Sequence, residues 1–463
     1  MHPSWLAAEA FDVRSYPKSW WAESLATPAQ HFPCLEEDIK AEVAIIGAGY
    51  TGLNAALGLA SRHSMDTIVL EAAQPGWGAS GRNGGFCSPG GAHMGYDEMI
   101  NKWGLETTRE LCQAQEDAIA YVGNLGESLN IDFDRAGSGE YIVGSGARAH
   151  QDAIDEAQWM NSKLGVAASA LSQDDLRERG LFSPLFTGAL HMPKGFGLHP
   201  LKYTLGLARA AAEAGVRIFG DSGVSSWRQE GGEHVLETVR GTVRAKHVLL
   251  ATNGYTPSGV GKPMASRLMP VFSNILVTRV LSKEELQAQG WLKTELAADD
   301  RELLHYFRLL PDGRFMFGGR GGIGGTQTEE AIVRRRLVAE FRSLFPAWRE
   351  VSFDYFWSGL VCLCRDNVFH VGAMPERNNA WYGLAFHGGG VSMASWAGAA
   401  RADMIAGASS SGKATCSSAT GPLVSNPAAT HATNQPQFGR GRSGPSRSSA
   451  AAMLSQITVT GTF

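Results

Sequence analysis

The apolar positions near the start of the chain change from a short continuous run to helical spacing and back again. Residues 43–46 form an uninterrupted apolar run, which is typical of a strand buried on both faces of a parallel sheet. Residues 53–61 are rich in helix-forming side chains, and a second apolar run follows at 67–70. This strand–helix–strand order predicts a parallel unit that opens an α/β domain.

Three glycines connect the first strand to the helix with the spacing Gly-x-Gly-x-x-Gly. Gly47 allows the tight turn, Gly49 lets the backbone approach a pyrophosphate, and Gly52 lets the helix pack closely on the strand. The positive end of the helix dipole would then face the phosphates. Glu71 ends the second strand 19 residues after Gly52, where its carboxylate can accept a hydrogen bond from a ribose hydroxyl. The pattern predicts a site for FAD or NAD rather than NADP; the alternative is a tight turn in an unrelated fold.

Composition narrows the possible partners. The chain has 463 residues, enough for two domains or one with a large insertion, and a formal net charge of −4, so no basic field recruits nucleic acid. No apolar run is long enough to span a membrane, and the N-terminus lacks a secretory signal. The six cysteines are scattered, and the close pair Cys362 and Cys364 suits strand packing better than a metal site. We expect a reduced, cytoplasmic protein with no metal, no membrane span and no nucleic-acid partner.

A glycine-rich loop follows the second strand. Five of the ten residues from 76 to 85 are glycine, a density that excludes the interior of a helix or strand. Such a loop has free backbone N–H groups and small side chains, so it can wrap a large planar or anionic ligand. Arg82 adds a guanidinium for a phosphate or a flavin carbonyl. The loop is therefore predicted to contact a cofactor; the alternative is a flexible surface loop.

A hairpin is predicted over residues 303–319, around the turn Pro311-Asp312-Gly313. Alternation along its first strand places Tyr306 and Arg308 on one face and His305 on the other. A tyrosine and an arginine on one face can hold a substrate carboxylate or shape a pocket over a cofactor. The alternative is a solvent-facing cross-strand pair.

A second glycine-rich segment precedes the last predicted helix, residues 392–405. Gly388, Gly389 and Gly390 leave the N-terminal end of this helix open to a ligand. Its dipole would stabilise the negative charge that a reduced flavin develops at its pyrimidine end. His387 directly precedes these glycines and is a candidate for a catalytic role.

The glycine motif, Glu71 and the segment Gly78-Ala-Ser-Gly-Arg-Asn-Gly-Gly85 together resemble the FAD-dependent amine and amino-acid oxidases. That family includes D-amino-acid oxidase, glycine oxidase and sarcosine oxidase, and the nearest likeness is to the gamma-glutamylputrescine oxidase type. The resemblance implies an α/β fold: a Rossmann-like FAD-binding domain of the glutathione-reductase type, interleaved with an α+β substrate domain built on an antiparallel sheet. Many relatives carry Gly-His-Gly before the last helix. Here Gly389 takes the middle place and His387 lies two residues earlier.

The motifs and the resemblance together define the candidate site. In the resembled family the position of Val224 meets the adenine, and the strand that ends at Thr252 and Asn253 lies beside the pyrophosphate. The candidate FAD contacts are Gly47, Gly49, Tyr50, Thr51, Gly52, Glu71, Ala72, Ser80, Arg82, Asn83, Gly84, Gly85, Val224, Thr252, Asn253, Gly388, Gly389, Gly390 and Val391. The candidate catalytic residues are Tyr306, Arg308 and His387.

The same considerations predict how the chain is divided. The expected parts are an N-terminal arm, 1–40; a discontinuous FAD-binding domain, 41–95, 191–262 and 346–407; and a substrate domain, 96–190 and 263–345. Residues 408–463 contain no Asp or Glu and are dominated by small and polar residues, so this tail is predicted to be disordered. The family normally continues with a folded segment, so we hypothesise that the tail has a different origin, such as a frameshift.

The leading expectation is an FAD-dependent oxidase that oxidises a C–N bond of an amine or amino acid to an imine and reduces O2 to H2O2. The alternative is a dehydrogenase that passes electrons to a quinone or a partner subunit. Relatives that use oxygen often place a lysine beside the flavin, and the sequence assigns none here. A non-catalytic FAD-binding protein is a third interpretation. The sequence defines neither the amine nor the oligomeric state.

Overall fold

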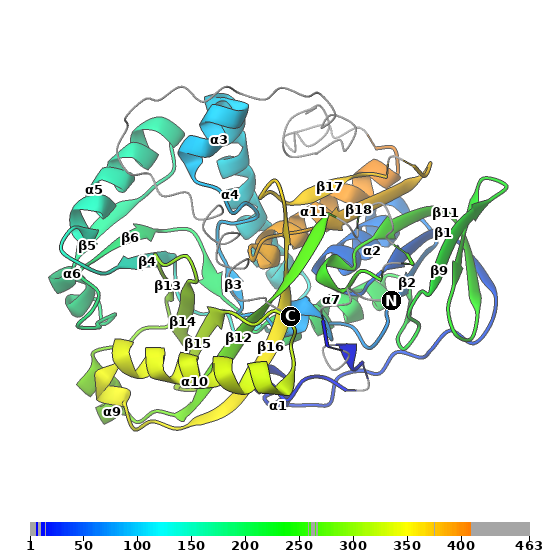
Figure 1. Cartoon of the computed structure of the whole chain (residues 1–463). Helices are drawn as coiled ribbons and strands as arrows, with labels where there is room; N and C mark the ends of the chain where they lie inside the picture. Colours follow the sequence, from blue (N-terminus) through cyan, green and yellow to red (C-terminus); the bar gives the residue numbers. More distant parts are fainter. Residues whose placement is uncertain are drawn as a thin grey trace, which may run out of the picture.

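Two sheets of eight strands each organise the protein and lie side by side (Figure 1). The computed structural model describes residues 6–7, 11–13, 15–257, 259–260, 264, 267–374 and 376–408. The predicted disordered tail lies outside the described residues from position 409 onward.

The first sheet is built on the apolar runs that the sequence predicts as buried strands. Its strands run in the order β17-β18-β11-β1-β2-β8, and the hairpin of β9 and β10 joins β11. From β18 to β8 each strand is parallel to its neighbour, whereas the edge strand β17 pairs antiparallel with β18. The bounds are β1 Ile39–Ile46, β2 Thr67–Leu70, β8 Arg217–Phe219, β9 Ser226–Glu230, β10 Glu233–Glu237, β11 Thr242–Leu250, β17 His370–Ala373 and β18 Ala380–Leu384.

Helix α2 (Tyr50–His63) follows β1 after a turn of only three residues. A Cβ added to Gly52 would overlap the carbonyl oxygen of Gly47, so only glycine allows the helix to approach the strand this closely. This contact fixes the N-terminal end of α2 at the carboxyl end of β1, which is the geometry that a dinucleotide site needs.

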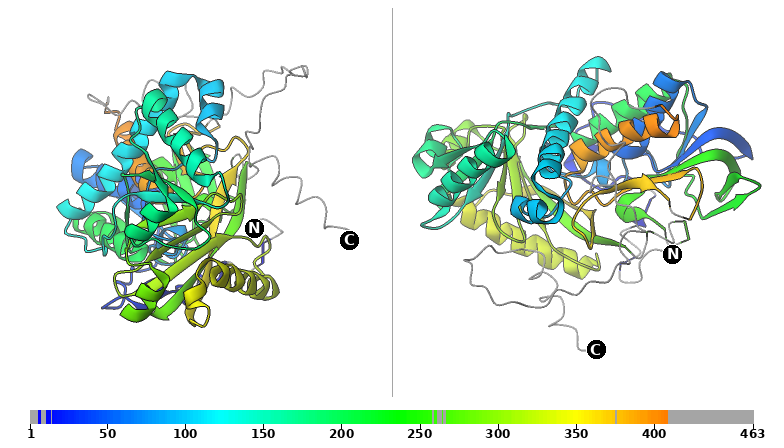
Figure 2. Two further views of the ribbon diagram at one scale, coloured as in Figure 1. Left: turned by 90° about the vertical axis from the view of Figure 1, so that its left-hand side faces the viewer. Right: turned by 90° about the horizontal axis from the view of Figure 1, so that it is seen from above.

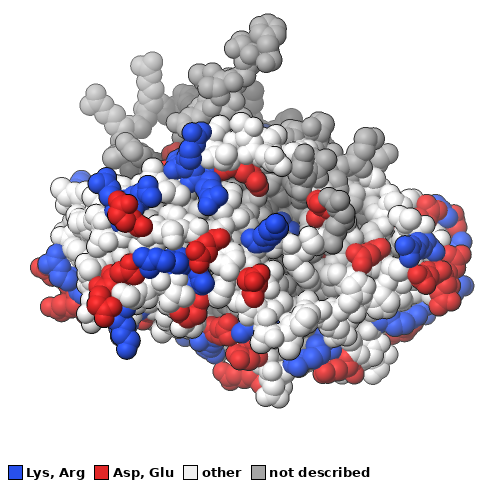
Figure 3. Space-filling view, turned by 90° about the horizontal axis from the view of Figure 1, so that it is seen from below, with Lys and Arg blue, Asp and Glu red and all other residues white. Residues whose placement is uncertain are grey.

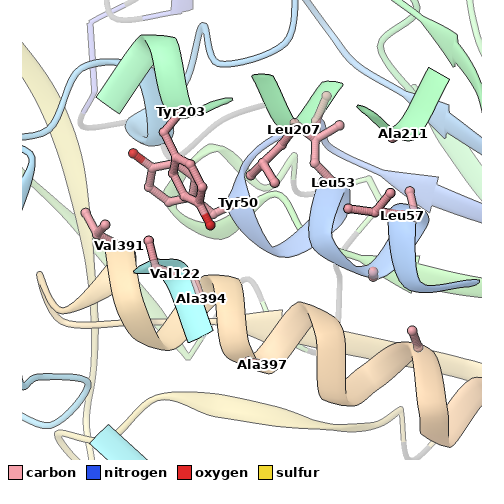
Figure 4. Close-up of a cluster of buried hydrophobic side chains, with 14 of the residues drawn as sticks. Tyr50, Leu53, Leu57, Val122, Tyr203, Leu207, Ala211, Val391, Ala394 and Ala397 are labelled. Carbon is pink, nitrogen blue, oxygen red and sulfur yellow. The ribbon is translucent and has the colours of Figure 1, made fainter. Parts of the chain in front are cut away.

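Two helices pack directly on α2, and a third packs on one of them. Helices α7 (Pro200–Glu213) and α11 (Gly390–Ile405) contact α2, and α4 (Leu105–Ser128) packs on α11. Figure 4 shows the side chains between these helices, including the rings of Tyr50 and Tyr203, whose centroids are 5.2 Å apart. Small residues on α11, such as Ala394, let its backbone come close to α2.

The second sheet runs in the order β16-β12-β15-β14-β13-β4-β6-β5. Its neighbours are antiparallel except for β13 and β4, which pair in parallel, so the sheet is mixed rather than antiparallel as predicted. Strand β16 lies in this sheet, whereas the predicted boundary at 346 placed its residues in the FAD-binding domain. The bounds are β4 Glu140–Gly144, β5 Ser169–Ser172, β6 Gly188–Met192, β12 Leu268–Val280, β13 Leu296–Asp299, β14 His305–Leu309, β15 Arg314–Arg320 and β16 Phe353–Cys364.

Helices and a short ribbon complete the described fold. The helical segment from 96 to 128 is divided into α3 and α4 because Gly104 adopts a φ of +86° and ends α3. Helix α10 covers one face of the second sheet and lies below it in Figure 1. The remaining bounds are α1 Trp20–Glu23, β3 Phe86–Cys87, α3 Tyr96–Trp103, α4 Leu105–Ser128, α5 Ala149–Trp159, α6 Gln173–Glu178, β7 Phe196–Gly197, α9 Lys283–Gln289 and α10 Gln327–Leu344.

The N-terminal arm packs on the glycine-rich loop. The Trp21 indole is buried and its Nε1 donates to the carbonyl oxygen of Asn83 at 2.9 Å. The Trp21 ring also contacts the ring of His199, with centroids 4.9 Å apart. The imidazole of His199 caps the N-terminal end of α7 by accepting from the Lys202 N–H at 3.1 Å, so this histidine has a structural role.

The surface carries charges of both signs. Lys and Arg are interspersed with Asp and Glu on the face seen from below (Figure 3). Among the described helices, none combines the length and the apolar composition that a membrane span requires. Figure 2 shows the same two-sheet arrangement from the side and from above, with α4 beside α11.

Gly398 on α11 offers a test of the contact between α11 and α2. A Cβ at this position would overlap the carbonyl oxygen of Thr51, whereas a Cβ at Gly123 on α4 would meet only the end of the Arg135 side chain. Both are helix-interior glycines, so alanine gains about 1 kcal/mol of helix propensity at each. We expect Gly398→Ala to lower the free energy of unfolding by about 1–3 kcal/mol in urea titrations and Gly123→Ala to leave it equal or higher. Equal stability of the two variants would contradict the close helix contact.

Candidate active site

One cavity of about 760 Å³ connects the two sheets. Its walls comprise the carboxyl ends of β1 and β2, the glycine-rich loop, the N-terminal end of α11 and one face of the second sheet. In open α/β sheets, ligands bind outside the carboxyl ends of the parallel strands, and this cavity begins there. The predicted site residues all line it except Gly52, Gly85 and Arg308.

The nucleotide end of the cavity is the part formed by the turn after β1 and by Glu71. Gly47 adopts a φ of +107°, and an added Cβ would lie 2.8 Å from the Ala251 carbonyl oxygen, so this turn requires glycine. Gly49 is the N-cap of α2 and supplies no side chain to cap it, which leaves the helix end open to an anion. Other predicted contacts that line this end are Tyr50, Thr51, Ala72, Val224 and Thr252.

Glu71 is fixed by backbone donors. Its carboxylate accepts from the N–H of Ala48 at 2.7 Å and from that of Ala73 at 3.1 Å. Burial raises the pKa of Glu71, while these backbone N–H groups favour its charged form. The carboxylate therefore stays at the carboxyl end of β2, beside the glycine turn, where the sequence predicts a ribose.

The glycine-rich loop is held by its own side chains. Asn83 donates to the carbonyl oxygens of Ala79 and Ser80 at 3.0 Å and accepts from the Gly85 N–H at 2.8 Å. Ser80 Oγ accepts from the N–H of Tyr50 at 3.0 Å, which ties the loop to the start of α2. These contacts favour a defined loop over the flexible alternative.

The Arg82 guanidinium donates its hydrogen bonds to backbone carbonyl oxygens of the protein. Its Nε donates to the Trp77 carbonyl oxygen at 2.9 Å, and its Nη1 donates to that of Ser358 at 3.3 Å. The guanidinium also lies 4.5 Å from the centroid of the Trp77 ring. Arg82 lines the cavity but is anchored in this way, so a direct contact with FAD stays a prediction.

The N-terminal end of α11 forms the opposite end of the cavity. Gly388, Gly389, Gly390 and Val391 line it, and α11 has no side-chain cap. A Cβ at Gly389 would overlap the backbone of Gly90, so glycine is required for this approach. Asn253 holds the segment before α11, because its Oδ1 accepts from the Ala385 N–H at 2.8 Å.

His387 presents an unpaired nitrogen at this end. Its Nε2 lies 3.0 Å from Cys364 Sγ, whereas its buried Nδ1 has no hydrogen-bond partner within the described part of the chain. Burial lowers the pKa of His387 to about 4, so the ring is neutral at pH 7. Nδ1 is therefore an open position for a polar atom of a cofactor or substrate.

The face of the second sheet that lines the cavity carries Tyr306, Ser273 and Arg320. Tyr306 pairs with Gly318, two residues from Arg320, and Arg320 pairs with Ser273, so the three side chains share a face. The Tyr306 hydroxyl lies 2.8 Å from Ser273 Oγ, and burial raises the pKa of Tyr306 to about 12. Arg320 was missed from the sequence; the alternation that selected Tyr306 also selects it once the register of β14 and β15 is known.

Arg308 is a correction to the predicted site. It shares the face of Tyr306, as alternation predicts, but its side chain is 1% exposed and does not line the cavity. Its Nε donates to the Gly84 carbonyl oxygen at 3.2 Å and its Nη2 to that of Leu198 at 2.6 Å. Arg308 therefore holds the glycine-rich loop against the second sheet, in place of the substrate contact that was expected. His305 points the other way and bonds Asp299 and Glu340.

Four carboxylates on the cavity wall were also missed. Glu140 and Asp299 are buried, whereas Glu156 and Asp300 are exposed. The sequence gives no signal for them, because they lie in segments without a recognisable motif. Glu140 and Asp299 reach the cavity through the pairing of the second sheet, and Glu156 lies on α5.

A family model described as DAO, FAD dependent oxidoreductase, matches residues 42–404. The chain belongs to this family. Gamma-glutamylputrescine oxidoreductase of Escherichia coli K12 is 30% identical over 395 residues, which cover 85% of this chain and 90% of the relative. The probable oxidoreductase OrdL of Haemophilus influenzae is 29% identical over 401 residues, 86% of this chain and 90% of that protein. The crystal structure of glycine oxidase from Geobacillus kaustophilus has a TM-score of 0.66 at 18% identity and covers 80% of this chain and 96% of that chain.

Family membership confirms the predicted α/β fold, the FAD cofactor and the class of enzyme. The protein is an FAD-dependent oxidoreductase. The residues present fit the cofactor: two uncapped helix ends and glycine backbone face the cavity, and His387 Nδ1 is unpaired. The nucleotide end would hold the adenine dinucleotide part, and the segments around Gly84 and Gly388 the flavin ring.

Gly49 gives a direct test of the cofactor site. A Cβ at this position would lie 2.8 Å from Ser80 Oγ, and the full valine side chain would fill the space at the start of α2. We expect purified Gly49→Val to carry little flavin absorbance per mole of protein, while Gly123→Ala matches the wild type. Full flavin content in Gly49→Val would contradict this placement of the phosphates.

Arg308 separates a positioning role from a substrate contact. Arg308→Met keeps much of the volume but leaves the Gly84 and Leu198 carbonyl oxygens without their donors. We expect a loss of roughly 2–4 kcal/mol in the free energy of unfolding, the size expected for a buried charge-assisted pair of hydrogen bonds. Unchanged stability together with a selective rise in KM would instead indicate that Arg308 binds substrate.

Proposed function

We propose that the protein is an oxidase that converts a C–N bond of an amine or amino acid to an imine, with O2 reduced to H2O2. The observation that carries the proposal is the single cavity that holds both the nucleotide end and a wall of the second sheet. A cofactor and a second small molecule can therefore share it, which a simple carrier of FAD does not need. When bound, FAD accepts a hydride equivalent from the substrate and passes the two electrons on.

Several side chains that line the cavity can form hydrogen bonds with a substrate while they are uncharged. Burial lowers the pKa of both His387 and His93 to about 4, so their rings are neutral. The unpaired Nδ1 of the neutral His387 ring can form a hydrogen bond with a polar group of a substrate or cofactor. Tyr306 remains protonated, so its hydroxyl can donate to a substrate.

Positive potential at the α11 end supports O2 as the acceptor. Arg320 Nη2 lies 3.5 Å from the position of a Cβ added to Gly388, next to the positive end of the α11 dipole. The reduction of O2 passes through anionic species, which such a potential stabilises. The dehydrogenase remains the second candidate, because no lysine is among the described residues that line the cavity.

The test is a panel of amines and amino acids assayed in parallel for oxygen uptake, peroxide release and reduction of a quinone-like dye. We expect at least one amine to give oxygen uptake with one equivalent of peroxide per imine formed. Dye reduction without oxygen uptake would establish the dehydrogenase instead. A protein that binds FAD but whose flavin no amine reduces would contradict both.

A further inference from the structure

Arg320 is a buried cation with no carboxylate partner among the residues that the structure describes. Its side chain lines the cavity, and the residue is 8% exposed. The guanidinium contacts His93 Nε2 at 3.4 Å and the His387 carbonyl oxygen at 3.5 Å. No carboxylate of the described chain lies within ion-pair distance of it, and burial lowers the pKa of Arg320. The group thus has hydrogen-bonding capacity and charge that the protein leaves unmatched.

Glu140 is a buried carboxylate with no cationic partner among the described residues. It lines the same cavity, is also 8% exposed, and forms no salt bridge with any described residue. A hydrogen bond with the Ser88 side chain favours its charged form, but burial raises the pKa of Glu140 to about 7, so a cation beside it is needed to keep it fully charged at pH 7. By contrast, Asp299 on the neighbouring strand is paired with His305 at 2.7 Å and with Arg301 at 3.2 Å.

The two unmatched charges are far apart on one face of the sheet. Arg320 lies on β15 and Glu140 on β4, three strands away in the order β15-β14-β13-β4. At about 4.8 Å between neighbouring strands, the two strand axes are about 14 Å apart. Arg320 and Glu140 each lie two residues from the row in which Gly318, Tyr306, Ala298 and Ile142 pair, on opposite sides of it, so the offset along the strands is four residues, or about 14 Å more. Arg320 and Glu140 therefore cannot neutralise each other without a molecule between them.

We propose that the substrate is an extended zwitterion whose carboxylate binds Arg320 and whose ammonium group binds Glu140. This inference rests on the proposed function, since it assigns the substrate of the same cavity. An unpaired buried charge costs several kcal/mol, and a ligand that brings the opposite charge recovers part of that cost. Arginine also suits a carboxylate because its planar fork donates two parallel hydrogen bonds.

The spacing excludes the shortest zwitterions. In an α-amino acid such as glycine the ammonium and carboxylate groups are attached to the same carbon, so one molecule cannot reach both residues. The assigned substrate has several bonds between the two groups, as in an ω-amino acid or an α-amino acid with a distal ammonium. Either kind presents a C–N bond for the proposed oxidation.

The test measures binding without turnover, so that it stays independent of the oxidase activity. The ligands are carboxylates with a terminal trimethylammonium group, whose nitrogen has no lone pair and cannot form an imine. We would titrate the FAD-loaded protein by calorimetry with glycine betaine and with the butanoate, pentanoate and hexanoate homologues. We expect one of the longer ligands to bind roughly 10- to 100-fold more tightly than glycine betaine, the factor expected for one charge-assisted contact.

Variants assign each end of the ligand. Arg320→Gln and Glu140→Gln should each remove most of the gain for the longer ligand, whereas Arg320→Lys, which retains the charge, should keep part of it. Glu178→Gln, which changes an exposed carboxylate on α6 outside the cavity, is the matched control and should bind like the wild type. Flavin content of every variant is measured in the same samples, so that a loss of FAD is not mistaken for a loss of binding.

Several results would overturn the assignment. These are equal affinity for glycine betaine and the longer ligands, unchanged affinity in Glu140→Gln or Arg320→Gln with full flavin content, an equal loss in the control Glu178→Gln, or no binding at any length. If some amines still reduce the flavin in such a case, the proposed oxidase function would still hold, and only the assignment of an extended zwitterion as substrate would be wrong. The inverse result, tight binding of the long ligands without flavin reduction by any amine, would remove the oxidase and keep the two-charge site.

Discussion

The contact on which the rest of the site depends is the one between the glycine-rich loop and the second sheet. A Cβ at Gly84 would lie 2.8 Å from the Tyr306 ring, and one at Gly85 would lie 2.6 Å from Arg308 Nη2. Arg308 donates to the carbonyl oxygens of Gly84 and Leu198, so its buried guanidinium holds the loop against the second sheet. The absence of side chains at these glycines lets the sheet lie directly on the cofactor loop, and the cavity follows from that closeness.

The local part of this arrangement could be predicted from the sequence. The turn after β1, helix α2 and Glu71 lie within one strand–helix–strand unit, whose contacts are close in the chain and whose glycines have clear steric causes. Alternation along β14 also placed Tyr306 and Arg308 on one face correctly. The family resemblance, read from separated glycine motifs, was confirmed by the match over residues 42–404.

The remaining features depend on pairings that no local pattern encodes. The parallel pair of β4 with β13 joins Glu140 to Leu296, so neither the mixed sheet nor the carboxylate wall is visible in the sequence. Arg320 required the register of β15 against β14 and β12. Arg308 is buried because its guanidinium donates to the carbonyl oxygens of Gly84 and Leu198, which come from two distant segments of the chain. The division into domains and the origin of the tail stay predictions.

The central claim is that the flavin ring lies between the glycine-rich loop, the α11 end and the Tyr306 face of the second sheet. The most direct measurement is a crystal structure of the FAD-loaded protein. The account predicts ordered density for the ring in contact with the Gly84 and Gly388 segments, with Tyr306 and Arg320 facing the space above it. Density for the adenine part at Gly47 and Glu71 combined with a ring turned out of this cavity would contradict it.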